Sequence, residues 1–161
     1  VEEDEFIDKD INIRDYLSEI ISSFKEISKK DFIFNFDQDS NPKKITKSIE
    51  IVYGLRNFIG NANKFAKNTI FINLKSDSEI TEIIIEDDGN GYPKDILSKI
   101  GEPYLRSNNT QEKSKIGLGL GLFIGKNLLE KNFATIICRN SKTRRGAEVI
   151  IKWENRDLFN I

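Results

Sequence analysis

The stretch Lys115–Lys131, KIGLGLGLFIGKNLLEK, places a glycine at every second position just before a helix-like run. Glycines and leucines alternate over six residues: Gly117, Leu118, Gly119, Leu120, Gly121 and Leu122. Each glycine inside a helix or strand costs roughly 0.5–1 kcal/mol relative to alanine. Two interpretations are open: bare backbone N–H groups that approach phosphate oxygens at a helix N-terminus, or a tight loop that packs closely on a sheet.

Length and composition bound the possibilities. The 161 residues fit one domain, with 38% hydrophobic and 32% charged residues, as in a soluble globular protein. A net charge of -1 gives no indication of a nucleic-acid partner, and no apolar run approaches the ~20 residues of a membrane span. Cys138 is the single cysteine, and histidine, the most common general base, is absent. The chain starts at Val1 and contains no methionine, which predicts a piece of a longer protein.

Three helices are predicted from the spacing of apolar residues. The first begins at Ile13 and carries its apolar stripe to Ile27, and the second extends from about Ile45 to Phe65. The third begins in the Gly-Leu stretch and ends near Lys131.

Strands are predicted from alternating or β-branched apolar runs. Five segments have this character: DFIFNFD (31–37), NTIFINLKS (68–76), EITEIIIEDD (79–88), ATIIC (134–138) and AEVIIKW (147–153). The second and third are expected to form a hairpin. Residues 89–116 lack periodicity and are expected to form a long polar loop, which in a compact domain is usually functional or mobile. The order of elements predicts an α/β two-layer sandwich, with a mixed sheet and helices on one face.

A second motif, DDGNG at residues 87–91, ends the third of these strands. It fits a simple turn. It also fits a ligand site, in which the Asp87 carboxylate accepts a hydrogen bond from a ligand amino group. Gly89 and Gly91 would then let the ligand ring lie against the backbone.

A third motif, NFIGNANKF at residues 57–65, places Asn57, Asn61 and Lys64 on one helix face. Asparagine is a poor helix former, so two of them inside a helix call for a reason. An amide oxygen is a hard, neutral ligand suited to Mg²⁺, and a lysine one turn on can neutralise phosphate. The alternative is a solvated polar face in a chain rich in asparagine and lysine.

Taken together and in this order, the three motifs resemble the ATP-binding catalytic domain of sensor histidine kinases. These belong to the GHKL superfamily, which includes gyrase, heat-shock chaperone and mismatch-repair ATPases. The likeness has five parts: NFIGNANKF to the N box, DDGNG to the G1 box, GLGLGL to the G2 box, GEPYLRS (101–107) to the F box, and RRGAEVIIKW (144–153) to the closing strand. The resemblance implies the Bergerat fold, with a mostly antiparallel mixed sheet and about three helices on one face.

The resemblance also implies domain boundaries. Residues 11–156 would form the ATP-binding catalytic domain. Residues 1–10 would lead in from a preceding dimerisation domain, and residues 157–161 would be a C-terminal tail.

At the phosphate end, the resemblance assigns roles to four side chains and one backbone segment. Asn61 would ligate Mg²⁺, with Asn57 one turn earlier on the same face. Lys64 would contact the phosphates, and Arg106 would supply positive charge near the γ-phosphate. The backbone of Gly117–Leu122 would wrap the phosphates.

At the base end, the resemblance makes Asp87 the acceptor of a hydrogen bond from the adenine amino group. Gly89 and Gly91 would shape that pocket. A long ATP lid would run from about Tyr104, itself a nucleotide-binding residue, to Ile116.

Asn57 stands where ATP-hydrolysing relatives carry a glutamate that activates water. An amide cannot act as a general base at neutral pH. The resemblance therefore implies a domain that holds Mg·ATP for a histidine on a separate dimerisation domain, which then passes the phosphate to the receiver domain of a response regulator. The full-length protein would be a homodimer, with a monomer left open for this fragment. Two alternatives remain: a GHKL ATPase of the gyrase or mismatch-repair type, and an anti-sigma-factor serine kinase.

Two departures from the family pattern stand out. Gly101 replaces the phenylalanine that usually opens the F box, a form that resembles the RegB/PrrB-type redox sensor kinases. Ala147 replaces a common threonine. The resemblance implies a cytoplasmic domain of a membrane-anchored protein, without nucleic-acid or membrane contacts of its own. Cys138 is expected to be a buried small apolar residue, and Trp153 to seal the core.

Overall fold

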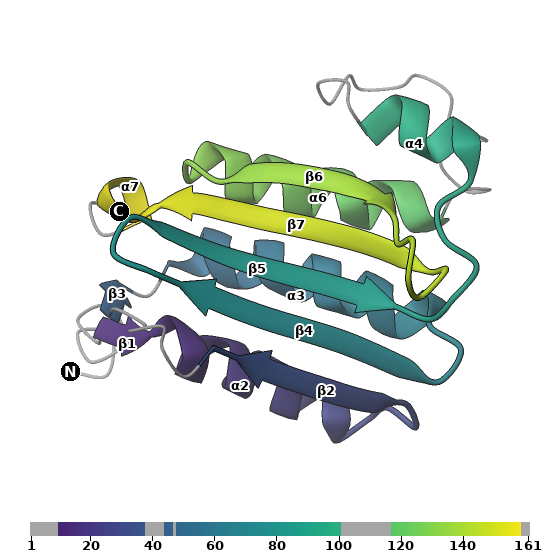
Figure 1. Cartoon of the computed structure of the whole chain (residues 1–161), viewed down its shortest axis with the longest axis horizontal. Coiled ribbons are helices and arrows are strands. Elements are labelled where there is room, and N and C mark those ends of the chain that lie inside the picture. Colours follow the sequence, from purple (N-terminus) through teal and green to yellow (C-terminus); the bar gives the residue numbers. More distant parts are fainter. Residues whose placement is uncertain (1–9, 38–43, 47, 101–116, 159–161) are drawn as a thin grey trace.

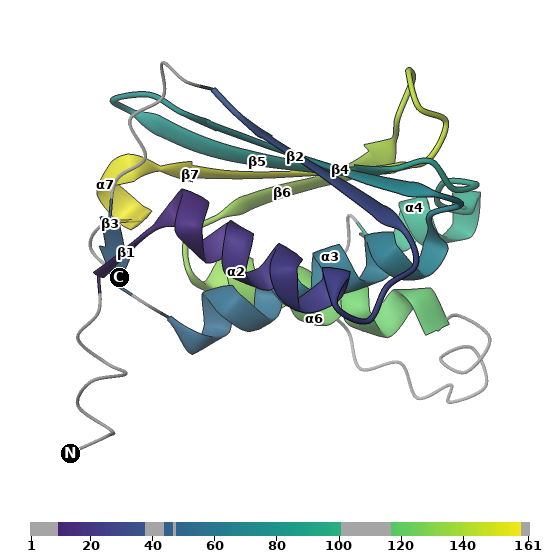
Figure 2. The same ribbon diagram turned by 90° about the horizontal axis from the view of Figure 1, so that it is seen from below.

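The computed structural model describes residues 10–37, 44–46, 48–100 and 117–158. The main sheet has five strands and is seen in Figure 1, and Figure 2 shows helices lying along one of its faces. These helices are α2 (Ile13–Lys25), α3 (Ile49–Phe65) and α6 (Gly117–Lys131). The predicted α/β two-layer sandwich is confirmed.

The main sheet is mixed, with strand order β2-β4-β5-β7-β6. Its strands are β2 (Asp31–Phe36), β4 (Thr69–Ser76), β5 (Ile80–Asp87), β6 (Thr135–Asn140) and β7 (Ala147–Glu154). Only the β2–β4 pairing is parallel, and the other three are antiparallel. The predicted hairpin is thus confirmed as β4–β5. Its turn is held by Asp77 Oδ1, which accepts hydrogen bonds of 2.7 Å from the backbone N–H groups of Glu79 and Ile80.

The helix carrying the predicted N box begins later than expected. Lys44–Thr46 forms strand β3, which pairs antiparallel with β1 (Asp10–Asn12), so the expected start at Ile45 is wrong. The Ser48 side chain caps α3 by accepting a hydrogen bond from the Ile51 N–H group. Along the helix, the buried residues recur at the spacing of one face: Ile51, Gly54, Leu55, Phe58, Ile59 and Ala62.

The first helix ends earlier than its apolar pattern predicted. α2 ends at Lys25, and Ile27 lies beyond it with 80% of its surface exposed. The pattern continued past the helix because a single apolar residue can match the spacing by chance.

Glycines let α3 and α6 approach closely. A β-carbon on Gly54 would lie 2.6 Å from Leu129 Cδ2, and one on Gly125 would lie 3.0 Å from Phe58 Cε2 and 3.2 Å from the Gly54 carbonyl oxygen. The helices run antiparallel, because Gly54 faces the C-terminal half of α6 whereas Gly121 faces Asn61. This crossing places the start of α6 beside the asparagines of α3.

The long loop expected at 89–116 contains a helix, so that prediction is wrong for its described part. Lys94–Ile100 forms α4, which contacts α6 and β6 and buries Ile96 and Ile100. Two apolar residues one turn apart are too few to produce a recognisable period, and Pro93 directly before them looks like a loop residue.

The C-terminal end of the sheet is closed by core residues. Trp153, on β7, is fully buried and donates a hydrogen bond of 3.0 Å from Nε1 to the Asn132 carbonyl oxygen, which confirms its predicted place in the core. The following helix α7 (Asn155–Leu158) buries Leu158, so the boundary expected at residue 156 falls inside it. Among the described residues, no helix combines the length and apolar character of a membrane span.

Candidate functional site

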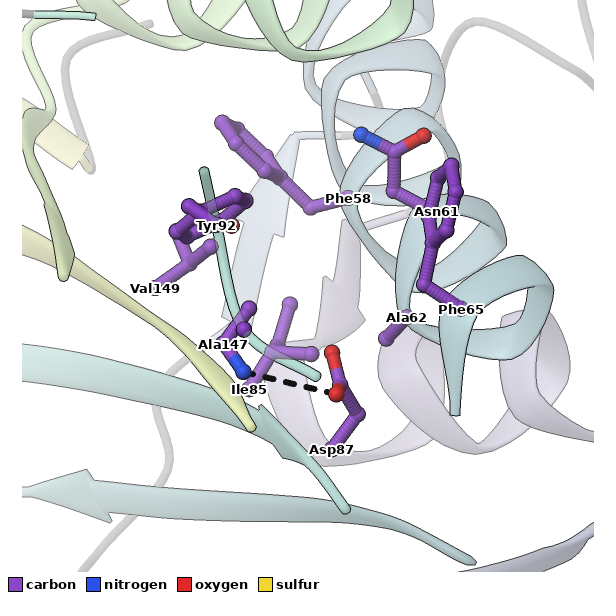
Figure 3. Close-up of a pocket in the computed structure, with 10 residues that line it drawn as sticks. Phe58, Asn61, Ala62, Phe65, Ile85, Asp87, Tyr92, Ala147 and Val149 are labelled. Atoms are coloured by element: carbon purple, nitrogen blue, oxygen red, sulfur yellow. Dashed lines mark hydrogen bonds between the residues drawn. The ribbon is translucent and has the colours of Figure 1, made fainter. Parts of the chain in front are cut away.

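A pocket opens between α3, the end of β5 and the start of β7 (Figure 3). The empty space in and above it, counted together with the open solvent at its mouth, is about 350 Å³. Ten residues line it: Phe58, Asn61, Ala62, Phe65, Ile85, Asp87, Gly91, Tyr92, Ala147 and Val149. The lining is apolar except for a few polar groups, as in sites for small organic ligands.

Asp87 is the acidic side chain that lines the pocket, and it lies at the last position of β5. Only 3% of its surface is exposed. Its Oδ1 accepts hydrogen bonds from the Gly89 N–H group (2.8 Å) and the Ala147 N–H group (3.4 Å), while its second oxygen points into the pocket in Figure 3. Burial raises the pKa of this carboxyl above its ordinary value, although the two backbone donors oppose the rise.

Asp88, the neighbouring acid, serves the fold instead. Its two carboxylate oxygens accept hydrogen bonds from the backbone N–H groups of Lys67, Asn68 and Thr69, at 2.8–3.2 Å. Partial burial acts to raise its pKa, but these donors together hold the pKa below its ordinary value. Asp88 thus ties the end of β5 to the segment that joins α3 to β4, and the ligand contact expected of Asp87 stays a prediction.

The glycines around Asp87 are required by close packing. A β-carbon on Gly89 would overlap the Phe65 carbonyl oxygen, and one on Gly146 would overlap the Asp87 carbonyl oxygen. Gly91 has a φ of +80°, in the left-handed region that favours glycine. Because these positions have no side chains, the backbone segments at the base of the pocket pack directly against one another.

Tyr92 lines the pocket, and Cys138 of β6 lies behind it. Tyr92 is 7% exposed, and its hydroxyl is hydrogen-bonded to the Cys138 thiol. Burial raises the pKa of Tyr92 well above its ordinary value and that of the Cys138 thiol to about 12. Cys138 was expected to be buried and is partly buried, packed against the core, and a thiol with this pKa is not ionised at neutral pH.

The asparagines predicted to serve the phosphate end lie together. A β-carbon on Gly121 would lie 3.4 Å from Asn61 Oδ1 and 3.7 Å from Asn57 Oδ1, so both amide oxygens face the start of α6. Asn57 Nδ2 donates a hydrogen bond of 2.7 Å to the Tyr53 carbonyl oxygen of its own helix. Asn61 Nδ2 is buried without a hydrogen-bond partner among the described residues. Buried polar atoms are rarely left unpaired, so this N–H donor is open to an acceptor such as a water or ligand oxygen, and the role of Asn61 as a ligand-binding residue stays a prediction.

The remaining predicted residues are less informative. Lys64 is exposed at the end of α3, with its ammonium 5.3 Å from the centroid of the Phe65 ring, and its phosphate contact stays a prediction. Gly117–Leu120 begins α6, and nothing further is described of its side chains. Tyr104, Arg106 and the lid they were expected to form lie outside the described residues.

Within the described ranges, no group of three or more acidic, histidine or cysteine side chains could hold a metal ion by itself. The donor set near Gly121 consists of the two asparagine amides. Such a set suits Mg²⁺, which keeps several waters and takes few protein ligands alongside phosphate oxygens. In Asn61 the amide oxygen Oδ1 is the atom that could hold the ion, and the unpaired Nδ2 could donate a hydrogen bond to a phosphate oxygen, so this side chain fits a magnesium-phosphate ligand.

Several pocket residues were not singled out as functional from the sequence. Phe58 and Ala62 appeared only in the apolar stripe of α3, and Tyr92 stood in the expected loop. Ile85 and Val149 belong to strands whose alternation predicted core. A signal did exist for Ala147, because it follows Gly146 directly in the closing motif.

Comparisons with known proteins agree with this geometry. Residues 46–157 match the model of the family described as histidine kinase-, DNA gyrase B-, and HSP90-like ATPase. The sensor histidine kinase RegB of Cereibacter sphaeroides is 38% identical over 108 residues, which cover 64% of this chain and 23% of that protein. Sporulation kinase A of Bacillus subtilis is 32% identical over 88 residues, 55% of this chain and 13% of that protein. The chain thus spans about a quarter or less of the length of these relatives.

Solved structures show the same fold. The catalytic domain of histidine kinase ThkA has a TM-score of 0.70 at 21% identity, covering 91% of this chain and 96% of that one. The family model covers most of the chain, and the pocket lies within the matched residues. This chain belongs to the family of histidine kinase-, DNA gyrase B- and HSP90-like ATPases, in the form of an ATP-binding catalytic domain like those of sensor histidine kinases.

Proposed function

We propose that this domain binds Mg·ATP in the pocket of Figure 3 and donates the γ-phosphate to a histidine on a separate dimerisation domain. The histidine would pass the phosphate to an aspartate of a response regulator. The names of the matched relatives, sensor histidine kinases, support this proposal. So does the absence of histidine from the chain, because the acceptor must then come from elsewhere.

The base would bind against Asp87. Its Oδ1 is already engaged by two backbone donors, which leaves the second oxygen for the 6-amino group of adenine. Guanine carries a carbonyl at that position, so it would place an acceptor against an acceptor. Ala62, Ile85 and Ala147 offer small or flat apolar surfaces for the ring.

The phosphates would lie between Asn61 and the start of α6. A magnesium ion, when bound, would neutralise charge on the phosphate oxygens. Asn61 would hold that ion through its amide oxygen Oδ1, and Gly121 leaves the space open because it has no side chain. Lys64, Arg106 and Tyr104 stay in the roles predicted from the sequence. The chain's contribution to transfer is then positioning and charge neutralisation.

A single observation carries the choice of acceptor: the α3 side chain that faces the start of α6 beside Asn61 is the amide of Asn57, with no carboxylate in its place. Neutral amides cannot take a proton from water, so hydrolysis lacks its general base. A histidine nucleophile brings its own basicity. The gyrase-like ATPase alternative is therefore not favoured.

In the experiment, this domain is mixed with a dimerisation domain that carries a histidine, and ATP labelled on its γ-phosphate is added. We expect phosphate on that histidine, labile in acid, together with slow ATP hydrolysis by the domain alone. Rapid ATP hydrolysis without phosphate transfer would contradict the proposal. Phosphoserine on an anti-sigma partner would instead support the serine-kinase alternative. In the full-length protein we expect a cytoplasmic position, a homodimer and a membrane anchor outside this domain.

A further inference from the structure

The β6–β7 hairpin supports the pocket from outside. Asn140, the last residue of β6, makes two hydrogen bonds to the backbone of Tyr92, which is 48 residues away in the sequence. Asn140 Oδ1 accepts a bond of 2.6 Å from the Tyr92 N–H group, and Asn140 Nδ2 donates one of 3.2 Å to the Tyr92 carbonyl oxygen. One side chain thus satisfies both backbone groups of a residue that lines the pocket.

The segment around Tyr92 needs such an outside partner. It lies between β5 and α4, in neither helix nor strand, so no ladder of hydrogen bonds fixes it. Buried backbone groups in this position must be paired by side chains or water. Gly91 packs closely against the Asn140 side chain, because a β-carbon there would lie 2.7 Å from Asn140 Oδ1.

The same hairpin also holds the opposite side of the pocket. Asn140 is paired in register with Ala147 across β6 and β7. The Ala147 N–H group donates to Asp87 Oδ1. Next to Asn140, Ser141 Oγ donates a bond of 2.8 Å to Glu86 Oε2, at the residue before Asp87. The cross-strand pair of Asn140 and Ala147 therefore connects the backbone of Tyr92 to the carboxylate of Asp87.

We propose that Asn140 is a positioning residue for recognition of the nucleotide base. By fixing the backbone of Tyr92 relative to Asp87, it sets the width of the slot that receives the ring. The inference rests on the proposed binding of ATP in this pocket. It predicts a contribution to affinity that comes from the base alone and is independent of the phosphates and of magnesium.

The test measures the affinity of Asn140→Ala for adenosine and for Mg·ATP by calorimetry. Two hydrogen bonds at a partly exposed site correspond to a loss of about three- to tenfold, which we expect for both ligands alike. Asn140→Asp keeps an acceptor for the Tyr92 N–H group but has no donor for its carbonyl oxygen. Its loss should be smaller, and it provides a second variant if Asn140→Ala folds poorly.

Asn155→Ala is the matched control. Asn155 also bridges two segments, since its Oδ1 accepts a bond of 2.7 Å from Thr81 Oγ1 and its Nδ2 donates one of 2.8 Å to the Asp77 carbonyl oxygen. It lies at the opposite end of β5 from the pocket. We expect this variant to lower the melting temperature and to leave adenosine affinity unchanged.

Two results would overturn the inference about Asn140. One is unchanged adenosine affinity in a folded Asn140→Ala protein, which would make the residue structural only. The other is a loss confined to ATP, which would place its effect at the phosphates. Failure of the proposed function has a different signature: wild-type protein that binds adenosine and ATP but transfers no phosphate to histidine leaves the Asn140 result standing. Wild-type protein that binds neither ligand overturns both.

Discussion

The backbone N–H group of Ala147, at the start of β7, donates a hydrogen bond of 3.4 Å to Asp87 Oδ1, at the end of β5. With the Gly89 donor at 2.8 Å, it occupies one carboxylate oxygen and orients the other towards the pocket. The acidic group is thus fixed by backbone atoms, whose positions depend on the sheet more than on any one side chain.

Asp87→Asn tests the base contact. The new amide oxygen can still accept from Gly89 and Ala147, but an NH₂ group then faces the adenine amino group. Two donors in contact leave both unpaired, so we expect ATP affinity to fall about 10- to 100-fold in calorimetry. Asp88→Asn is the control, because Asp88 accepts hydrogen bonds from backbone N–H groups outside the pocket. This substitution should lower the stability of the protein and leave its ATP affinity unchanged. Unchanged affinity in Asp87→Asn would remove Asp87 from the base site.

The raised pKa of Asp87 predicts opposite pH trends for stability and binding. Burial disfavours the ionised carboxylate, so its contribution to folding stability is fully present below its ordinary pKa and is lost as the pH rises through the raised value. Asp87→Asn should therefore gain stability relative to the wild type between acidic and neutral pH. Adenosine affinity should instead weaken as the pH falls through the raised pKa, because protonation removes the better acceptor. Parallel trends in the two measurements would contradict this assignment.

Asn61→Ala separates ligand binding from folding. Asn61 Nδ2 is buried without a partner in the described part of the chain, so its removal should leave the melting temperature of the free protein unchanged or slightly higher. The same variant should bind ATP equally with and without magnesium. A magnesium effect that survives the substitution would show that the ion is held elsewhere.

Gly121→Val tests the phosphate cradle. Its branched side chain would fill the space in front of the Asn57 and Asn61 oxygens, so ATP affinity should fall tenfold or more while adenosine affinity is retained. Gly54→Ala is the contrasting variant. Its β-carbon would meet the buried Leu129 side chain, costing about 1–3 kcal/mol of stability without separating the two ligands. Equal losses of ATP and adenosine in Gly121→Val would argue against a cradle.

The sequence predicted the features that repeat regularly and missed those that depend on contacts between distant residues. The periods of α2, α3 and the five strands of the main sheet were visible because each buries one face. β3 and α4 were missed because three residues, or two apolar residues one turn apart, carry too little period.

The same division holds in the site. Asp87 and Asn61 could be proposed as ligand-binding residues from the sequence, because each stands in a short motif whose residue types suggest a function. Asn140 was missed because its partner is 48 residues away and asparagine is common throughout this chain. Gly125 belongs to the same glycine-rich helix as Gly121, yet it packs against Phe58, which only the helix crossing reveals.

The burial of Trp153 makes the protein its own optical probe. It is the single tryptophan of the chain, and it is fully buried with its indole N–H group bonded to Asn132. Four residues of strand at about 3.4 Å each separate it from Val149, the pocket residue on β7 that is nearest to it in sequence, so the indole lies about 14 Å from the pocket wall. Intrinsic fluorescence should therefore follow global unfolding of every variant while remaining insensitive to nucleotide, so that lost affinity and lost structure can be read in one cuvette.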